Sequence, residues 1–103
     1  MRHEILLAPE AARQLQALSA HRRAQVRDAI ERYLRHEPAK TSKSRIKRLR
    51  GMSQPQYRLR VGEIRVYYDV TQGTVGILAI VTKADGQTWL AEHGTPSPGG
   101  APG

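Results

Sequence analysis

Three arginines within residues 57–68 have the spacing to form a cationic site. The segment reads YRLRVGEIRVYY, which is typical of two short strands joined by a two-residue turn at its Gly-Glu pair. In such a hairpin Arg60 lies opposite Arg65, and Arg58 lies opposite Tyr67. Because like charges directly opposite each other destabilise a sheet, the pattern favours a site that an anion completes. Phosphate suits it, since the planar arginine fork binds phosphate through two parallel hydrogen bonds.

The charge of the surrounding chain favours the same interpretation. The protein has 103 residues, of which 17 are lysine or arginine and 9 are aspartate or glutamate, and its formal net charge is +8. No acidic residue lies between Pro38 and Gly62, so this stretch should attract polyanions such as nucleic acids. The alternative is a hydrated basic surface, or arginines paired with Asp69 and Glu63. The residues that we expect to bind RNA, by charge or by stacking on a base, are Lys43, Arg45, Lys47, Arg48, Arg50, Tyr67 and Trp89.

The composition excludes several other kinds of chemistry. The sequence has no cysteine, which excludes disulfides, a thiol nucleophile and a cysteine metal site. Its longest apolar run, from Ile77 to Val81, is too short to span a membrane, and the N-terminus lacks the apolar stretch of a signal peptide. We therefore expect a cytoplasmic protein of one domain, with no membrane partner and with neither a metal nor another cofactor.

Two helices are expected ahead of the basic stretch. Residues 3–8 have the pattern of a short strand, and Pro9 suits the first turn of a helix. Ser19 suits the N-cap of a second helix, which should end before Pro38. The short link between the two predicts an antiparallel helical hairpin. The apolar positions that give these helices their buried faces are Ala11, Leu15, Leu18, Val26, Ile30, Tyr33 and Leu34.

The later part of the chain alternates between apolar and polar residues, which predicts three antiparallel strands. The first turn joins the two arginine strands, and Gln72-Gly73 is a second hairpin signal. Both turns place one set of apolar side chains on a common core face. In this register Val75, Ile77, Ala79 and Val81 lie opposite Val70, Tyr68, Val66 and Ile64, while the arginines, Leu78 and Ile80 lie on the other face.

These elements predict an α+β fold, in which an N-terminal strand and an antiparallel helical hairpin pack on a small, mainly antiparallel sheet. Residues 1–93 form this domain. Residues 94–103 read GTPSPGGAPG, and this composition is typical of a disordered tail.

Residues 48–70, RLRGMSQPQYRLRVGEIRVYYDV, resemble the core signature of the RelE/ParE toxin superfamily, most closely its RelE branch. The LRGM stretch, the basic-x-basic strand and the arginine before VYY occur in the family's order and spacing. The resemblance implies the toxin of a type II toxin–antitoxin module. Such a toxin cleaves mRNA on the ribosome and is neutralised by a cognate acidic antitoxin, and the toxin–antitoxin complex can bind operator DNA.

The resemblance also implies which residues are catalytic. Attack of the ribose 2′-OH on the adjacent phosphate needs a base, an acid and cations for the developing charge. Arg58 and Arg60 stand at the family's basic strand pair, and Arg65 stands at its phosphate-stabilising arginine. The family's late basic residue falls at Ala84, so Lys83 is a possible substitute, and arginine is a poor general base. Two alternatives stay open: a ParE-like inhibitor of DNA gyrase, and a degenerate toxin that only binds its antitoxin or operator.

Overall fold

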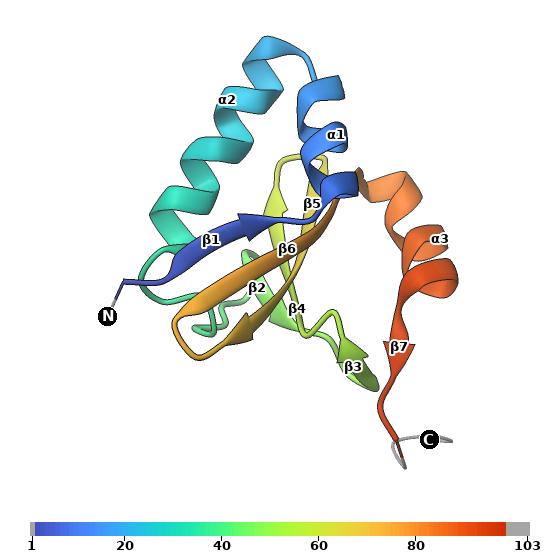
Figure 1. The fold of residues 1–103 in the computed structure, drawn as a ribbon. Helices are drawn as coiled ribbons and strands as arrows, with labels where there is room; N and C mark the ends of the chain where they lie inside the picture. Colours follow the sequence, from blue (N-terminus) through green and yellow to red (C-terminus); the bar gives the residue numbers. More distant parts are fainter. Residues whose placement is uncertain (1, 99–103) are drawn as a thin grey trace.

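A five-stranded sheet with the strand order β1-β6-β5-β4-β2 forms the centre of the molecule. The computed structural model describes residues 2–98. The edge strand β1 (Glu4–Leu7) runs parallel to β6 (Thr74–Thr82), and the other neighbours are antiparallel. The remaining strands of this sheet are β2 (Ile46–Arg48), β4 (Tyr57–Val61) and β5 (Ile64–Thr71). A separate pair joins β3 (Met52–Gln54) to β7 (Thr95–Pro96), as Figure 1 shows.

Two helices pack on one face of the sheet (Figure 1). They are α1 (Pro9–Ala17) and α2 (Ala20–Ala29), and α2 continues into the π-helical turn η1 (Ile30–Leu34). The Ser19 side chain accepts a hydrogen bond of 3.3 Å from the backbone N–H of Arg22, so the predicted N-cap is confirmed. The apolar face of this helical hairpin meets the sheet in one buried core, and the predicted α+β fold is confirmed. The largest of its fully buried side chains are Tyr68, Leu34, Leu59, Ile77, Val26, Val66 and Val75.

The β4–β5 hairpin has the predicted register. Arg58 pairs with Tyr67, and Arg60 pairs with Arg65. The turn begins at Gly62, whose φ of 57° lies in the left-handed region that only glycine adopts without strain. A glycine at this first position of a two-residue turn matches the right-handed twist of the strands. The three arginines are therefore held at fixed places on neighbouring strands.

The β5–β6 register is correct at the turn and wrong beyond it. Val70 pairs with Val75 and Tyr68 with Ile77, as predicted, but a bulge then shifts the register by one residue. Val66 pairs with Ile80 rather than Ala79, and Ile64 with Thr82 rather than Val81. A bulge adds one unpaired residue to one strand, here Leu78. The consequence is that Ile80 joins the core cluster, whereas Ala79 and Val81 pair with Tyr67 and Arg65 on the opposite face.

A third helix, α3 (Lys83–His93), follows β6 and was not predicted. Figure 1 shows that α3 lies apart from the α1–α2 pair. It leads into β7, so the predicted disordered tail differs from the structure at its start: Thr95 and Pro96 pair with β3, and the N–H of Ser97 bonds the carbonyl of Gly51 at 2.9 Å. Residues 99–103 of that prediction lie outside the described residues. Within residues 2–98, no helix combines the length and the apolarity that crossing a membrane requires.

Candidate nucleic-acid interface

The face of the sheet away from α1 and α2 carries Arg58, Arg60 and Arg65, and we call it the arginine face. Register places these residues in two rows across the strands. In one row Lys47 of β2 pairs with Arg58, which pairs with Tyr67; in the other Arg60 pairs with Arg65. The predicted register of the hairpin is therefore confirmed, and the structure adds Lys47 to the cluster through β2, a strand that the sequence analysis did not predict.

Arg65 is the most deeply placed of these cations. The residue is only 6% exposed, and its Nη1 donates to the carbonyls of Gly62 at 2.8 Å and Ile64 at 3.1 Å. These neutral carbonyls satisfy Nη1 but do not neutralise the charge of the guanidinium. A buried guanidinium without a carboxylate is costly to the fold, so an anion bound at this position would be favoured.

No acidic side chain compensates the arginine face within residues 2–98. Arg58, Arg60 and Arg65 take part in none of the salt bridges there. The alternative in which Asp69 pairs with them does not hold, because its carboxylate accepts from Gln54 Nε2 at 2.7 Å and from the N–H of Gln56 at 2.8 Å. The face is thus a cluster of positive charges whose counter-charge must come from solution or from a ligand.

Arg58 is half-buried, and its Nε has no hydrogen-bond partner. Burial lowers the pKa of Arg58, and the charges of Arg65 and then Arg60 lower it further, while Tyr67 opposes them. Arginine nevertheless stays protonated at neutral pH. The lowered pKa of Arg58 therefore reflects burial first and repulsion by Arg65 and Arg60 second, and it does not make Arg58 a general base.

Tyr67 and Trp89, predicted to stack on an RNA base, stack on each other instead. Their ring centroids lie 5.3 Å apart with an interplanar angle of 7°. Tyr67 is only 4% exposed, and burial raises its pKa although Arg58 and Arg65 act in the opposite direction. While α3 stays docked, the Tyr67 ring cannot reach a base, and its hydroxyl stays protonated near neutral pH.

The docking of α3 depends on contacts with distant parts of the chain. Trp89 stacks on Tyr67 of β5, and its Nε1 donates to Glu10 Oε1 of α1 at 3.2 Å. Within α3 the indole also lies 5.4 Å, centroid to centroid, from the His93 ring one turn further on. Gly86 is buried against Tyr67, whose hydroxyl oxygen would lie 2.5 Å from a Cβ at that position. These contacts explain why a glycine occupies the middle of α3.

Lys83 begins α3 beside the β4–β5 turn. Its N–H donates to the carbonyl of Glu63 at 2.7 Å, and its side chain is exposed, as is that of Ala84. This position puts Lys83 at the rim of the arginine face. A lysine there can supply charge or a proton to a ligand that extends beyond the turn.

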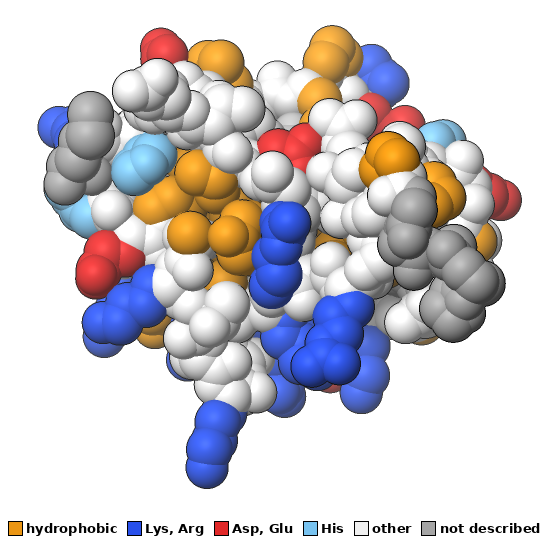
Figure 2. Space-filling view, turned by 90° about the horizontal axis from the view of Figure 1, so that it is seen from below, with side chains coloured by type: hydrophobic (Ala, Val, Ile, Leu, Met, Phe, Trp, Pro, Cys, Tyr) orange, Lys and Arg blue, Asp and Glu red, His pale blue; other side chains and the backbone are white. Residues whose placement is uncertain are grey.

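The other predicted RNA-binding residues are exposed but do not share one face. Arg45 lies over the Tyr33 ring at 4.6 Å. Arg48 lies over the Tyr57 ring at 5.2 Å and pairs with Tyr57, which in turn pairs with the buried Tyr68. Only Lys47 pairs directly with the arginine face, whereas Lys43 and Arg50 lie in exposed segments outside the strands. Figure 2 shows Lys and Arg side chains gathered mainly in the lower half of the view from below, so one side of the molecule is strongly basic.

Glu10 and the helix α3 contribute to the site. From the sequence, roles were assigned to Lys83 and Trp89, but neither the helix that carries them nor any part for Glu10 was predicted. One local signal was present: Thr82 is followed three residues later by Asp85, the pattern of a helix N-terminus. In the structure Thr82 Oγ1 accepts a hydrogen bond of 3.2 Å from the N–H of Asp85. The contact between Trp89 and Glu10 spans 79 positions and has no signal in a single sequence.

Comparisons with known proteins identify the fold. No family model and no curated protein matches the chain, but solved structures do. A chain of the toxin–antitoxin complex RelBE2 from Mycobacterium tuberculosis is 24% identical with a TM-score of 0.65, over 80% of this chain and 99% of that chain. A chain of the archaeal RelE–RelB complex from Pyrococcus horikoshii is 25% identical with a TM-score of 0.61, over 81% and 97%.

A third similar structure comes from the RelB–RelE antitoxin–toxin complex of Methanococcus jannaschii. Its chain is 21% identical with a TM-score of 0.64, over 82% of this chain and 96% of that chain. The resemblance noted in the sequence is therefore confirmed at the level of the fold: this chain has the fold of RelE-type toxins.

Proposed function

We propose that this protein is the toxin of a type II toxin–antitoxin module and that it cleaves mRNA on the ribosome. The observation that carries the proposal is the arginine face: Arg65 is buried without a carboxylate, and Arg58 and Arg60 stand beside it in fixed register. A phosphodiester bound there would supply the missing negative charge. The toxin assignment is further supported by the shared fold with chains of RelB–RelE complexes.

The proposed reaction is attack of the ribose 2′-oxygen on the adjacent phosphorus. The 2′-oxygen forms a bond to phosphorus as its proton passes to solvent water, the bond from phosphorus to the 5′-oxygen breaks, and that oxygen takes up a proton. A cyclic phosphate and a free 5′-hydroxyl result. Arg58, Arg60 and Arg65 stabilise the charge that develops on the phosphorane oxygens, which is commonly the largest contribution of such a site. Lys83, at the rim, is the candidate donor to the leaving 5′-oxygen.

A second candidate function is binding without catalysis. The arginine face supplies no group with a pKa suited to a general base, since arginine stays protonated and Tyr67 is buried under α3. The position of the family's late basic residue holds Ala84. On this account the protein would bind its antitoxin, and operator DNA through that complex, but would not cleave RNA.

The proposed partners are a cognate acidic antitoxin, the ribosome and mRNA, all in the cytoplasm. The net charge of +8 would accelerate encounter with each of these negatively charged partners. Antitoxin and RNA would compete for the same basic surface, and this competition would neutralise the toxin.

A translation assay with toe-printing of ribosome-bound mRNA tests the proposal. Wild-type protein should produce new toe-prints within codons at the ribosome, and addition of the antitoxin should remove them. The Arg60→Glu variant should produce none and should not arrest growth when induced. Translation that continues with intact mRNA while DNA gyrase is inhibited would support the ParE-like alternative. The absence of both mRNA cleavage and gyrase inhibition would support the non-catalytic candidate.

A further inference from the structure

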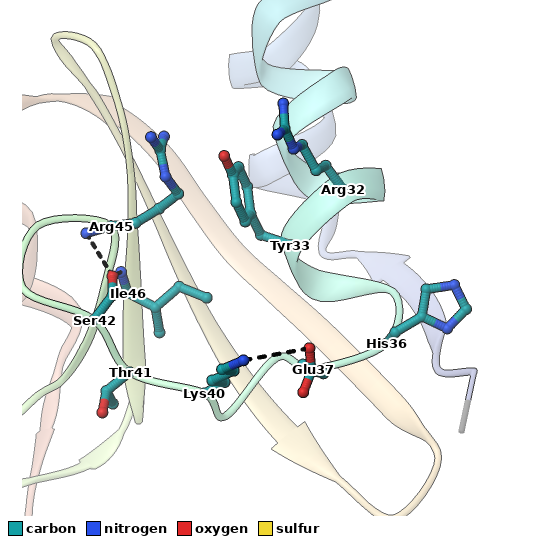
Figure 3. Close-up of a pocket in the computed structure, with 9 residues that line it drawn as sticks. All are labelled: Arg32, Tyr33, His36, Glu37, Lys40, Thr41, Ser42, Arg45 and Ile46. Atoms are coloured by element: carbon teal, nitrogen blue, oxygen red, sulfur yellow. Dashed lines mark hydrogen bonds and ion pairs between the residues drawn. The ribbon is translucent and has the colours of Figure 1, made fainter.

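Apart from the arginine face, a cavity lined by cations lies between η1 and the loop that precedes β2. It has a volume of about 390 Å³, and its lining includes Arg32, Tyr33, Lys40 and Arg45. Figure 3 shows Tyr33 projecting from the helix toward Arg45, with Arg32 beside it and Lys40 below. The single acidic lining residue, Glu37, lies 3.9 Å from Lys40. The cavity is therefore positively charged, and its two arginines form no salt bridge within residues 2–98.

The cations of this cavity are held in place by their neighbours. The Tyr33 ring lies 4.6 Å from the Arg45 guanidinium and 5.5 Å from that of Arg32, distances at which a ring attracts a cation. Ser42 Oγ accepts from the N–H groups of Arg45 at 3.0 Å and Ile46 at 3.2 Å, which fixes the loop. Tyr33 itself belongs to the π-helical turn, and such turns occur frequently at functional sites.

The cavity is continuous with the arginine face. A neighbouring cavity of about 340 Å³ shares Arg32, Tyr33 and Arg45 with it and extends to Gly62. One acidic residue, Asp28, lines this part, so its two arginines still outnumber its carboxylate. A third, of about 300 Å³, is lined by Ser44, Arg45, Arg60 and Gly62. Arg45 lines all three, and its carbonyl accepts the N–H of Arg60 at 2.8 Å. A groove thus leads from Arg60, past Arg45, to η1.

We propose that this groove binds the backbone phosphates of the RNA strand that the arginine face holds, with Arg45 and Arg32 as the phosphate ligands. The inference rests on the proposed function and extends it to a second part of the surface. RNA suits the part of the groove between Arg45 and Arg60 better than a protein segment does, because no apolar side chain lines that part; Ile46, Ala29 and Val61 line only the parts nearer to the helices. Bidentate guanidinium groups are suited to phosphate oxygens, and the groove continues the path of a strand that leaves the arginine face over the β4–β5 turn.

The test compares two double variants with the same loss of charge. Arg32→Gln with Arg45→Gln alters the groove; Arg13→Gln with Arg22→Gln alters two exposed helical arginines that line none of its cavities. Binding of labelled single-stranded RNA of roughly 4 and roughly 10 nucleotides is measured at several salt concentrations. The 2′-positions are methylated to prevent cleavage. If the groove double variant fails to fold, Arg32→Gln alone repeats the test.

The wild type should bind the longer RNA more tightly than the shorter one, and the groove variant should lose most of this advantage. For the longer RNA the groove variant should bind about tenfold more weakly, as for a lost charge-assisted hydrogen bond. The slope of log affinity against log salt should become shallower by about 0.7 for each lost phosphate contact. The control variant should keep the advantage of length.

Equal behaviour of the two double variants would overturn the inference and leave the proposed function intact. The same holds if the groove variant binds RNA normally but captures the acidic antitoxin poorly, because the groove would then be a protein-binding site. The Arg60→Gln variant tests the proposed function separately: if it binds both RNA lengths as tightly as wild type does, the arginine face is not an RNA site.

Discussion

The two faces of the β4–β5 hairpin differ in burial and in charge, although their residues alternate along the same strands. Leu59, Val66 and Tyr68 are fully buried on one face, and the Tyr68 hydroxyl donates to the carbonyl of Pro38 at 2.6 Å. On the other face Arg58 leaves a buried Nε without a partner, and Arg65 has no counter-charge within residues 2–98. Where a protein breaks the rules of polar satisfaction, a functional site is the common reason. The core face stabilises the fold, whereas the uncompensated charges of the arginine face destabilise it until an anionic ligand binds.

Truncation on the core face should have the largest effect on stability. Leu59→Ala removes a side chain that is 0% exposed, so it should reduce the free energy of unfolding by about 2–5 kcal/mol. The matched change on the adjacent, exposed position, Arg60→Ala, should stay within about 0.5 kcal/mol of wild type. Urea unfolding of both variants measures the difference. If both substitutions reduce the free energy of unfolding by the same amount, the core face does not stabilise the fold more than the arginine face does.

The contact between α3 and Tyr67 should give the next largest effect. Gly86→Ala places a Cβ 2.5 Å from the Tyr67 hydroxyl oxygen, but 3.6 Å from the ring carbon that bears it. The variant should therefore lose about 1–2 kcal/mol, comparable to other overpacked sites. In a Tyr67→Phe background the clash disappears, and alanine should become neutral or stabilise by up to about 1 kcal/mol because it favours the helix.

A double-mutant cycle in denaturant measures this coupling. A coupling free energy near zero would show that α3 does not pack on Tyr67 as described. In that case the arginine face would be open, and Tyr67 and Trp89 would be free to stack on bases as the sequence alone suggested.

Removal of β7 should have a smaller effect. Deleting residues 94–103 eliminates the pairing of Thr95 and Pro96 with β3 and the bond from Ser97 to Gly51. The expected loss is about 1 kcal/mol, which lowers the melting temperature by about 4–8 °C in a domain of this size. Deleting only residues 99–103 is the control and should leave the melting temperature unchanged. If both deletions leave the melting temperature unchanged, the domain ends at residue 93, as the composition predicted.

Local rules predicted the parts of the fold that depend on neighbouring residues. The Gly62 turn fixed the pairing of Arg60 with Arg65, and alternation assigned Leu59 and Arg58 to opposite faces. The second hairpin was predicted correctly only near its turn, because a bulge at Leu78 shifts the strand and no turn residue marks it. Register errors of one residue exchange the two faces of a strand, which is why Ile80 was misplaced.

The parts of the site that depend on long-range packing could not be predicted. The helix α3 buries only Gly86, so it lacks the apolar stripe by which a helix is recognised in a sequence. Arg48 was grouped with the RNA-binding residues by charge, yet β2 places it over the Tyr57 ring. Charge along a sequence shows that a basic surface exists, but only the sheet shows which cations share a face.

The most direct test of the central claim is thermal unfolding of wild type and Arg60→Glu with and without a short 2′-O-methylated RNA. Without RNA the variant should be slightly more stable than wild type, by a few tenths to about 1 kcal/mol, because a like-charge cross-strand pair is replaced by an opposite-charge pair. With RNA at about 100 times its dissociation constant, wild type should gain about 2.7 kcal/mol, while the variant should gain much less. If RNA stabilises both proteins equally, or neither, the arginine face is a hydrated basic surface and not a phosphate site.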